Sequence, residues 1–512
     1  MNNSVNIPQK FTFPCSTDTI FIHDGRAEKQ PINYSDIAVY SQLLPHWLQI
    51  NESDDHTFIL QSENSVELCC LIAGLFIAGI PFCCIDPTWT PEQVLESTKE
   101  MPQSNYLTSA DISALHNQWI TSLSSHKASH KELSVSVKTR PFAFLFTSGS
   151  SSKPKRIPLR HQQLWAAYQA TQAKVQLSPN LSWGLCLPLH HIGALSIVLK
   201  SLLSHSAISL STSSDAQQWN SWLSGRGKCT IISMVPTQLH NWLEYNRSKR
   251  LSPTISSSFR FIIVGGGPAN AADVQRSEEL GWPILLSYGM TETFAHICSV
   301  PASQLPRPLE DPLPVGHMHP GQSLELRTDE DTQDPVLWIK GTQIFSPEPT
   351  QHQLQKSFDE QGWFCTGDIG NADINGLLYI QARRTDRIVS GGENVAVDWV
   401  INCLEQHPSV LECAIIGVPD PKWGQKVVAF IVPNRSILPP DTQKDIVAHP
   451  SFALSGLESN IVEKLIQKCR ETSLPVSHHP KEFYYLNALP RTSLGKLNMS
   501  RLQNLYALAR GK

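Results

Sequence analysis

The chain has 512 residues, of which 41% are hydrophobic and 17% are charged, and its 41 basic and 45 acidic side chains leave a net charge of -4. This length allows about two to four domains and an interior large enough for an enzyme. The nearly balanced charge excludes a protein that binds nucleic acid or an anionic membrane through net positive charge. We therefore expect no nucleic-acid partner.

The cysteine pattern predicts a reducing compartment. Twelve cysteines occur without CxxC or Cys/His metal spacing, and the adjacent pairs Cys69-Cys70 and Cys83-Cys84 lie in apolar surroundings. Cysteine behaves there as a small hydrophobic residue, so we expect a cytoplasmic protein without a zinc site. The first residues, MNNSVNIPQKFTF, lack a basic start followed by an apolar core, and we expect no signal peptide.

One stretch is long and apolar enough to resemble a membrane span. Residues from Leu68 to Ile85 carry no charged side chain. However, Gly79 and Pro81 divide the stretch into a helix from about Ser65 to Ala78 and a strand from Phe82 to Ile85. We interpret it as a buried helix that leads into a core strand, and we expect no stable membrane insertion.

Short apolar segments alternate with helical patterns through the first 119 residues. We expect strands at Thr19–His23, Thr57–Leu60 and Phe82–Ile85, and helices at Tyr34–Leu48, Ser65–Ala78 and Thr90–Met101. Such alternation predicts a mostly parallel sheet covered by helices. The Ser-, His- and Lys-rich region from Ile120 to Lys138 predicts a surface connection.

A phosphate-binding loop is predicted after the apolar strand from Phe142 to Phe146. The strand is followed by small hydroxyl side chains, one glycine and two lysines: Thr147, Ser148, Gly149, Ser150, Ser151, Ser152, Lys153 and Lys155. Close backbone N–H groups, hydroxyls and ammonium groups are what a polyphosphate requires. The Walker spacing is absent, which disfavours a P-loop kinase or GTPase. A solvated Ser-rich linker is the alternative interpretation.

The next segments end in residues suited to a ligand site. We expect strands at Leu185–Leu189, Ile231–Val235, Phe261–Val264 and Ile284–Ser287. The first leads to His190 and His191 before an apolar helix from Ala194 to Leu203. The third runs into Gly265, Gly266, Gly267 and Pro268, and the fourth into Tyr288, Gly289, Met290, Thr291 and Glu292. Ligands of open α/β sheets collect at the carboxyl ends of strands, where bare glycine backbone admits a flat group.

The last third of the chain changes character. Strands are expected at Gln322–Arg327, Val336–Lys340 and Leu377–Gln381, and Asp368 lies in a tight turn. A compact α+β pattern follows, so we place a domain boundary between residues 384 and 385, giving domains 1–384 and 385–512.

Seven motifs carry a resemblance to a known family. TSGSSSKPK, LPLHHIG, GGGP, SYGMTET, TGD, RRTDRIVSGGEN and PRTSLGK follow one another in the order of the adenylate-forming superfamily, which contains acyl-CoA synthetases and luciferases. Within it, LPLHHIGALSIVLKSL, SMVPTQL, SYGMTET and SGGENV most resemble 2-succinylbenzoate-CoA ligases of menaquinone biosynthesis. The resemblance implies an α/β fold, with a large N-terminal domain of parallel-rich sheets plus a β-rich part, and a small mobile α+β C-terminal domain.

The resemblance also implies cofactors and residue roles. The co-substrates are ATP and CoA, with Mg²⁺ held by Glu292. ATP contacts are implied at four places. The residues from Thr147 to Lys155 would hold the β- and γ-phosphates, Gly265 to Pro268 and Tyr288 would pack around adenine, and Asp368 and Arg383 would bind the ribose hydroxyls. Gly289 is the remaining ATP contact. Catalytic roles fall on Lys496, Glu292, Thr291 and His191. The acyl substrate would lie against His191, Lys200, Gly289 and Met290, CoA against Gly391 and Gly392, and the hinge at Thr385 and Asp386.

These positions also have plainer interpretations. Thr291-Glu292 is typical of a helix start, Asp368 of a turn cap, Lys496 of an exposed lysine and His191 of a core histidine. Lys200 lies in an apolar helix, where an ammonium group must reach either water along its own stem or an anion. The free carboxylate of 2-succinylbenzoate is such an anion.

The phosphate loop departs from the family pattern. Ser152 and Arg156 stand where the family usually has glycine. We expect either a stiffer loop or an additional phosphate contact from Arg156.

The leading hypothesis is an AMP-forming ligase that converts 2-succinylbenzoate, ATP and CoA into 2-succinylbenzoyl-CoA, AMP and pyrophosphate. An aryl- or fatty-acid-CoA ligase of the same fold is the second hypothesis, and a non-catalytic nucleotide-binding protein is the third. The expected partners are a small carboxylic acid, ATP and CoA. The sequence leaves a homodimer open.

Overall fold

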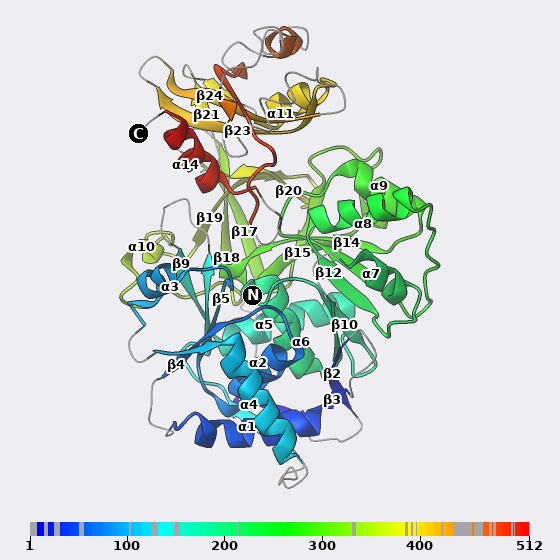
Figure 1. Ribbon diagram of the computed structural model, residues 1–512, viewed down its shortest axis with the longest axis vertical. Coiled ribbons are helices and arrows are strands. Elements are labelled where there is room, and N and C mark those ends of the chain that lie inside the picture. Colours follow the sequence, from blue (N-terminus) through cyan, green and yellow to red (C-terminus); the bar gives the residue numbers. More distant parts are fainter. Residues whose placement is uncertain are drawn as a thin grey trace. The chain divides into compact units, whose positions relative to one another are not determined.

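The computed structural model (Figure 1) describes residues 8–14, 19–24, 31–50, 56–101, 104–123, 132–147, 154–211, 215–329, 334–383, 388–390, 393–395, 397–420, 423–434, 453–454, 464–469, 474, 478–492, 495 and 497–510. The chain divides into two compact units, Met1–Gln381 and Ala382–Lys512. We call them the large unit and the small unit.

A five-stranded sheet in the large unit carries the predicted phosphate loop. Its strands, in spatial order, are β6 (Ser104–Thr108), β4 (Thr57–Gln61), β5 (Phe82–Ile85), β8 (Ala143–Thr147) and β9 (Lys155–Leu159). All neighbours are parallel except β8 and β9, which form an antiparallel hairpin. A separate two-stranded sheet pairs β1 (Lys10–Pro14) with β7 (Glu132–Ser136).

Helix α2 (Val66–Ala78) explains the uncharged stretch near the N-terminus. The Ser65 hydroxyl accepts a hydrogen bond from the Leu68 N–H at 3.1 Å and so caps the helix start. Gly79, with φ of +70°, ends it in the left-handed conformation that glycine adopts most readily. The chain then enters β5, whose residues are buried. No helix among the described residues is long and apolar enough to cross a membrane.

A thirteen-stranded sheet forms the other half of the large unit. Its strands, in spatial order, are β17 (Gln322–Thr328), β18 (Pro335–Gly341), β19 (Phe364–Ala372), β20 (Leu378–Arg383), β16 (Pro314–Met318), β15 (Ala295–Pro301), β14 (Ile284–Met290), β13 (Phe261–Val264), β12 (Ile231–Met234), β10 (Ser182–Leu185), β11 (Ala207–Leu210), β2 (Ile20–Asp24) and β3 (Ile32–Asn33). The run from β2 to β14 is parallel, and β14, β15, β16 and β20 pair antiparallel. The sheet therefore joins a parallel half to a β-rich half.

Helices cover the sheets. The other helices of the large unit are α1 (Tyr34–Trp47), α3 (Pro91–Thr98), α4 (Ser109–Ser122), α5 (His161–Val175), α6 (Ile192–Ser204), α7 (Ala216–Leu223), α8 (Pro236–Ser248), α9 (Ala271–Glu279) and α10 (His352–Gln355), with 3₁₀ turns η1 (Thr291–Thr293) and η2 (Ala302–Gln304). Helices α2, α5 and α6 lie between the five-stranded and thirteen-stranded sheets (Figure 1). Helices α7 to α9 pack with β12 to β14 around four buried tryptophans, Trp219, Trp222, Trp242 and Trp282.

The small unit is built on its own sheet. Strands β22 (Glu393–Val395), β21 (Ile388–Ser390), β24 (Gly424–Pro433), β26 (Glu482–Tyr485) and β25 (Ala453–Leu454) lie in that order, and β23 (Val410–Asp420) pairs with β24. Helix α11 (Val397–Glu405) packs with one apolar cluster and α14 (Met499–Ala509) with another. The two clusters use alternate residues of β24, as the two faces of a sheet require.

Three parts of the secondary-structure prediction were wrong. Asp368, predicted in a tight turn, lies within strand β19 (Phe364–Ala372), next to Gly367 with its positive φ of +74°. The strand predicted at Leu185–Leu189 lies earlier, at β10 (Ser182–Leu185), because the side chain of Asn64 takes the Leu187 C=O and the Leu189 N–H at 2.7 and 2.9 Å. The predicted surface connection from Ile120 to Lys138 contains the end of α4 and strand β7, which pairs with the distant β1. That pairing is long-range and leaves no local signal in a Ser- and Lys-rich segment.

Candidate functional site

The glycine segment predicted as an adenine floor begins at the carboxyl end of β13. Gly265 donates its N–H to the Met234 C=O at 3.2 Å, and a Cβ on Gly265 would lie 2.3 Å from the Ser287 hydroxyl oxygen. Gly266 has φ of +80°, where other residues are strained. Met234, Val264 and Ser287 lie on β12, β13 and β14, which are parallel neighbours. Gly265 to Pro268 therefore emerge at the sheet edge where the predicted Tyr288 to Glu292 segment also begins.

The segment from Tyr288 to Glu292 turns sharply at the end of β14. A bulge at Tyr288/Gly289 breaks the register with β15, and a Cβ on Gly289 would lie 2.0 Å from the Ala295 carbonyl oxygen. The turn η1 then presents Thr291 and Glu292. The Thr293 hydroxyl fixes the turn, since it donates to the Ala295 C=O at 2.6 Å and accepts from the Met290 N–H at 3.0 Å. Thr291 and Glu292 thus stand on a rigid, half-buried turn.

Tyr288 and Asp368 meet although their strands are not neighbours in the sheet. The Tyr288 hydroxyl donates to Oδ2 of Asp368 at 2.6 Å. Burial, with the adjacent Asp368 carboxylate, raises the pKa of Tyr288 well above its ordinary value, so the phenol remains a donor at neutral pH. The Thr366 hydroxyl accepts from the Asp368 N–H at 3.0 Å. The residues predicted to contact adenine (Tyr288) and ribose (Asp368) are thus hydrogen-bonded to each other.

The stem of the predicted phosphate loop is a β-hairpin. Thr147 and Lys155 are the last paired residues of β8 and β9, and the Thr147 hydroxyl lies 3.5 Å from the Lys155 C=O. Both residues are half-buried. Ser148, Gly149, Ser150, Ser151, Ser152 and Lys153 lie outside the described residues. The Arg156 guanidinium forms an ion pair with Glu348 at 2.9 Å and lies 4.8 Å from the centroid of the Phe144 ring.

The corner before α6 contains the predicted His191. His191 is the N-cap residue of α6 and is half-buried, with its ring 4.2 Å from that of His190. His190 Nε2 lies 3.7 Å from the Asp86 carboxylate. Asn64 bonds the backbone on both sides of Pro188, just before this corner. Sequence reasoning missed Asn64 and Asp86, because nothing local connects them to the histidines more than a hundred residues later.

Lys200 is completely buried in α6. Its side chain is 0% exposed, and Nζ has no hydrogen-bond partner among the described residues. Burial lowers the pKa of Lys200 to about 7. The proposal that Lys200 snorkels to water is therefore wrong, because the side chain does not reach the surface.

Two histidines lie within electrostatic reach of Lys200. Burial first, and then Lys200, lowers the pKa of His319 to about 3 and that of His296 well below its ordinary value. His296 Nε2 lies 3.2 Å from the Thr171 hydroxyl, and His319 Nε2 lies 3.0 Å from the Ser299 hydroxyl. Both imidazoles are therefore neutral at pH 7. Sequence reasoning missed them because they lie on and beyond β15, far from α6 in the chain.

The remaining predicted positions fall at or beyond the start of the small unit. Arg383 is the last residue of β20. Gly391 and Gly392 follow β21 but lie outside the described residues, as do the hinge residues Thr385 and Asp386 and the catalytic candidate Lys496.

Glu292 offers a single carboxylate to a metal ion. Among the described residues, no group of three or more His, Cys, Asp or Glu side chains is arranged to hold a metal. A lone carboxylate fits Mg²⁺ that is carried largely by nucleotide phosphates and water, because Mg²⁺ retains waters and needs few protein ligands. When bound there, the ion would neutralise phosphate charge.

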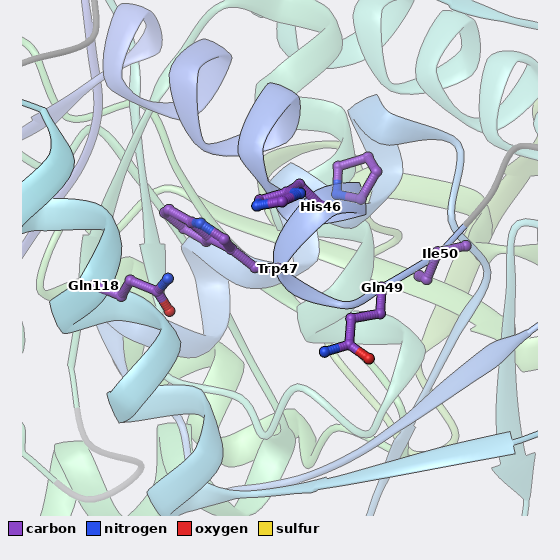
Figure 2. A pocket seen from close by; sticks show the side chains of 6 residues that line it. His46, Trp47, Gln49, Ile50 and Gln118 are labelled. Atoms are coloured by element: carbon purple, nitrogen blue, oxygen red, sulfur yellow. The ribbon is translucent and has the colours of Figure 1, made fainter.

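A surface hollow of about 520 Å³ lies at the end of α1 (Figure 2). It is lined by Pro45, His46, Trp47, Gln49, Ile50 and Gln118. None of the predicted site residues belongs to this set.

Comparison with known proteins identifies the family. The AMP-binding enzyme family matches residues 14–347, and the AMP-binding enzyme C-terminal domain matches residues 402–496. A 2-succinylbenzoate-CoA ligase of Bacillus cereus is 31% identical over 369 residues, which cover 70% of this chain and 69% of the relative. A second such ligase, from Bacillus mycoides, is 31% identical over 372 residues, with the same coverage of both chains.

Solved structures share the fold. The o-succinylbenzoate CoA synthetase (MenE) of Bacillus subtilis, in complex with the acyl-adenylate OSB-AMP, superposes with a TM-score of 0.76 at 22% identity, covering 96% of this chain and 98% of that one. ATP-bound MatB of Rhodopseudomonas palustris gives a TM-score of 0.76 at 20% identity, covering 96% and 97%. With the glycine segment, the Thr-Glu turn and the phosphate hairpin in one large unit, the chain belongs to the AMP-binding enzyme family.

Proposed function

We propose that the protein is an ATP-dependent ligase that converts 2-succinylbenzoate to 2-succinylbenzoyl-CoA. One carboxylate oxygen of the acid attacks the α-phosphorus of ATP, which forms the acyl-adenylate and releases pyrophosphate. The CoA thiolate then attacks the acyl carbon, and AMP departs. The first step is required because a carboxylate oxygen is a poor leaving group until it carries AMP. The names of the relatives, together with the site geometry, support this assignment.

Different residues of the site would contact the nucleoside and the phosphates of ATP. Asp368, held by Tyr288, would accept hydrogen bonds from the ribose hydroxyls, and Arg383 would donate to them. Gly265 to Pro268 would lie under adenine. Thr147, Lys155 and the loop between them would hold the β- and γ-phosphates, with Thr291 and Glu292 beside them. Lys496 would supply positive charge at the α-phosphate, where negative charge accumulates during displacement.

Lys200 is the observation that carries the substrate assignment. A buried ammonium group without a hydrogen-bond partner is costly unless an anion joins it. 2-Succinylbenzoate has two carboxylates, and only one of them is activated. We assign the second to Lys200, near neutral His296 and His319. A monocarboxylate pocket would have no use for this charge.

Several further assignments complete the proposal. The chain would form an adenylation domain (1–384) and a mobile C-terminal domain (385–512), with Thr385 and Asp386 as the hinge and Gly391 and Gly392 beside CoA. We place the enzyme in the cytoplasm, which is consistent with the lack of a disulfide bond among the described cysteines. We also propose a homodimer, which light scattering of the purified protein would test.

ATP–pyrophosphate exchange tests the function. We expect exchange with 2-succinylbenzoate, none without acid, and little with benzoate or a fatty acid; CoA should then yield the thioester. A preference for benzoate or a fatty acid would overturn the substrate and leave a CoA ligase. ATP binding without exchange in any acid would instead indicate a nucleotide-binding protein.

A further inference from the structure

The connection between β18 and α10 contacts two separate parts of the nucleotide site. We call residues 342–351 the brace. At its start, the Gln343 side chain donates to the Thr293 and His296 carbonyls at 3.1 and 3.2 Å, and Gln343 is 0% exposed. The Phe345 N–H donates to the Glu292 C=O at 2.8 Å. The brace therefore holds the turn that presents Thr291 and Glu292.

The other end of the brace holds the stem of the phosphate loop. Glu348 forms the 2.9 Å ion pair with Arg156, and the Gln351 side chain donates to the Arg156 C=O at 2.7 Å. The Glu348 N–H donates to the Gln351 side chain at 2.9 Å, which joins the two contacts into one unit. Arg156 pairs with Phe146 in the β8–β9 ladder, directly next to the Thr147–Lys155 pair.

The ion pair is sheltered from solvent. The side chains of Arg156 and Glu348 are 12% and 24% exposed, and the guanidinium also lies over the Phe144 ring. Exposed ion pairs contribute little to stability, but a charge-assisted hydrogen bond in a sheltered place fixes geometry more firmly. The guanidinium is thus engaged by Glu348 rather than directed at a phosphate. Of the two expectations for Arg156, this geometry favours the stiffer loop.

We propose that Arg156 and Glu348 are positioning residues that set the stem of the phosphate loop, at Thr147 and Lys155, relative to the Thr291–Glu292 turn. The inference rests on the proposed function, since it takes the loop to bind the β- and γ-phosphates of ATP. Glycine at 156, the usual family residue, would leave the stem without this side-chain link. The Arg156–Glu348 ion pair should therefore affect only the adenylation half-reaction, in which ATP still carries its β- and γ-phosphates. Thioester formation starts from the acyl-adenylate and needs no β- or γ-phosphate, so it should be spared.

Substitution of each partner tests the pair. In ATP–pyrophosphate exchange, Glu348→Gln and Arg156→Met should each raise KM for ATP about tenfold, and the double variant should be no worse than either single one. KM for 2-succinylbenzoate, and the rate of CoA transfer to supplied acyl-adenylate, should change less than about twofold. The charge exchange Arg156→Glu with Glu348→Arg should recover part of the loss. Glu278→Gln, which breaks the Arg307–Glu278 pair, is the matched control and should resemble the parent; Glu278 is 21% exposed, close to the value for Glu348, and Arg307 is 50% exposed.

The results distinguish failure of the proposed function from failure of the positioning role. A parent without ATP–pyrophosphate exchange would overturn the proposed function. An active parent whose Glu348→Gln variant keeps the parent's KM for ATP, or loses both half-reactions equally, would overturn the positioning role alone. Melting temperatures identify a variant that is merely misfolded, and the near-isosteric Glu348→Gln is then the decisive variant.

Discussion

Tyr288 on β14 donates a 2.6 Å hydrogen bond to Asp368 on β19, although β15, β16 and β20 stand between these two strands in the order of the thirteen-stranded sheet. Asp368 is 2% exposed, so its carboxylate depends on protein donors. The phenol remains protonated because burial and the carboxylate raise its pKa. Asp368 is thereby oriented for the ribose that we propose to bind there.

Tyr288→Phe should weaken ATP binding through this orientation. The phenyl ring keeps its packing, but Asp368 loses one hydrogen bond to a charged acceptor, which contributes about 1.5–3 kcal/mol. We expect KM for ATP to rise about tenfold or more, with a smaller change in KM for the acid. Steady-state kinetics with each substrate varied in turn would check this. An unchanged KM for ATP would contradict the orienting role.

Lys200 should lower the free energy of unfolding by an amount that depends on pH. The pKa of Lys200 is lowered from 10.5 to about 7 in the folded protein, so the unfolded chain binds more protons between these values. The free energy of unfolding should therefore rise with pH between about 7 and 10.5, and the destabilisation caused by Lys200 should be complete below pH 7. Lys200→Met should be more stable than the parent by about 2–5 kcal/mol at pH 6 to 7, and the gain should vanish near pH 10.5. Denaturant titrations at several pH values measure this, with exposed Lys249→Met as the control.

Lys200→Met should also be a poor catalyst with 2-succinylbenzoate. Without the ammonium group, the second carboxylate has no buried partner, so kcat/KM for 2-succinylbenzoate should fall by about 1.5–3 kcal/mol while KM for ATP stays near that of the parent. Lys200→Ala should behave alike in kinetics. In the parent, KM for 2-succinylbenzoate should rise above pH 7 as free Lys200 loses its proton. A variant that uses the acid as well as the parent would end the substrate assignment.

Gly289 should tolerate no side chain. A Cβ there would lie 2.0 and 2.5 Å from the carbonyl oxygen and carbon of Ala295 and 2.6 Å from the His296 Cα, all of them backbone atoms. Gly289→Ala must displace the bulge before Thr291, so we expect a loss of about 1–3 kcal/mol of stability and of most adenylation. Gly267→Ala, whose Cβ would lie 3.8 Å from Pro236, should keep the parent's melting temperature. Equal melting temperatures for both variants would contradict the clash.

Local patterns predicted the parts of the site that lie on single strands. Strand β8 before the phosphate loop, the glycines after β13 and the buried helix α2 follow from period, glycine and hydroxyl content, which act over a few residues. Strand β9, which pairs with β8 and completes the hairpin stem, was not predicted. The brace was missed because Glu348 meets Arg156 across nearly two hundred residues, and a Pro-rich loop carries no local signal of that contact. Asn64 displaced a predicted strand for the same reason: one side chain from elsewhere took the backbone bonds of Leu187 and Leu189.

The loop that carries Lys496 is closed by Arg491 in the small unit. Arg491 donates to the Gly495 C=O at 2.8 Å and forms an ion pair with Glu412 on β23. The Asn498 N–H donates to the Pro490 C=O at 2.8 Å, and the Asn498 side chain caps α14 through the Arg501 N–H. The residues on both sides of Lys496 are therefore anchored to the small unit.

Lys496 and Arg491 should serve adenylation rather than thioester formation. Lys496→Ala removes the charge proposed to meet the α-phosphate, so acyl-adenylate formation should be abolished while CoA transfer to supplied acyl-adenylate stays largely intact.

Arg491→Met releases the Gly495 carbonyl and should slow adenylation about tenfold, with Arg491→Lys losing less because it keeps a donor. Arg501→Met, exposed on α14, is the control and should match the parent. Single-turnover assays of each half-reaction separate the steps. Equal loss of both steps in Lys496→Ala would refute the division of labour, whereas a normal Arg491→Met would refute only the closure of the loop by Arg491.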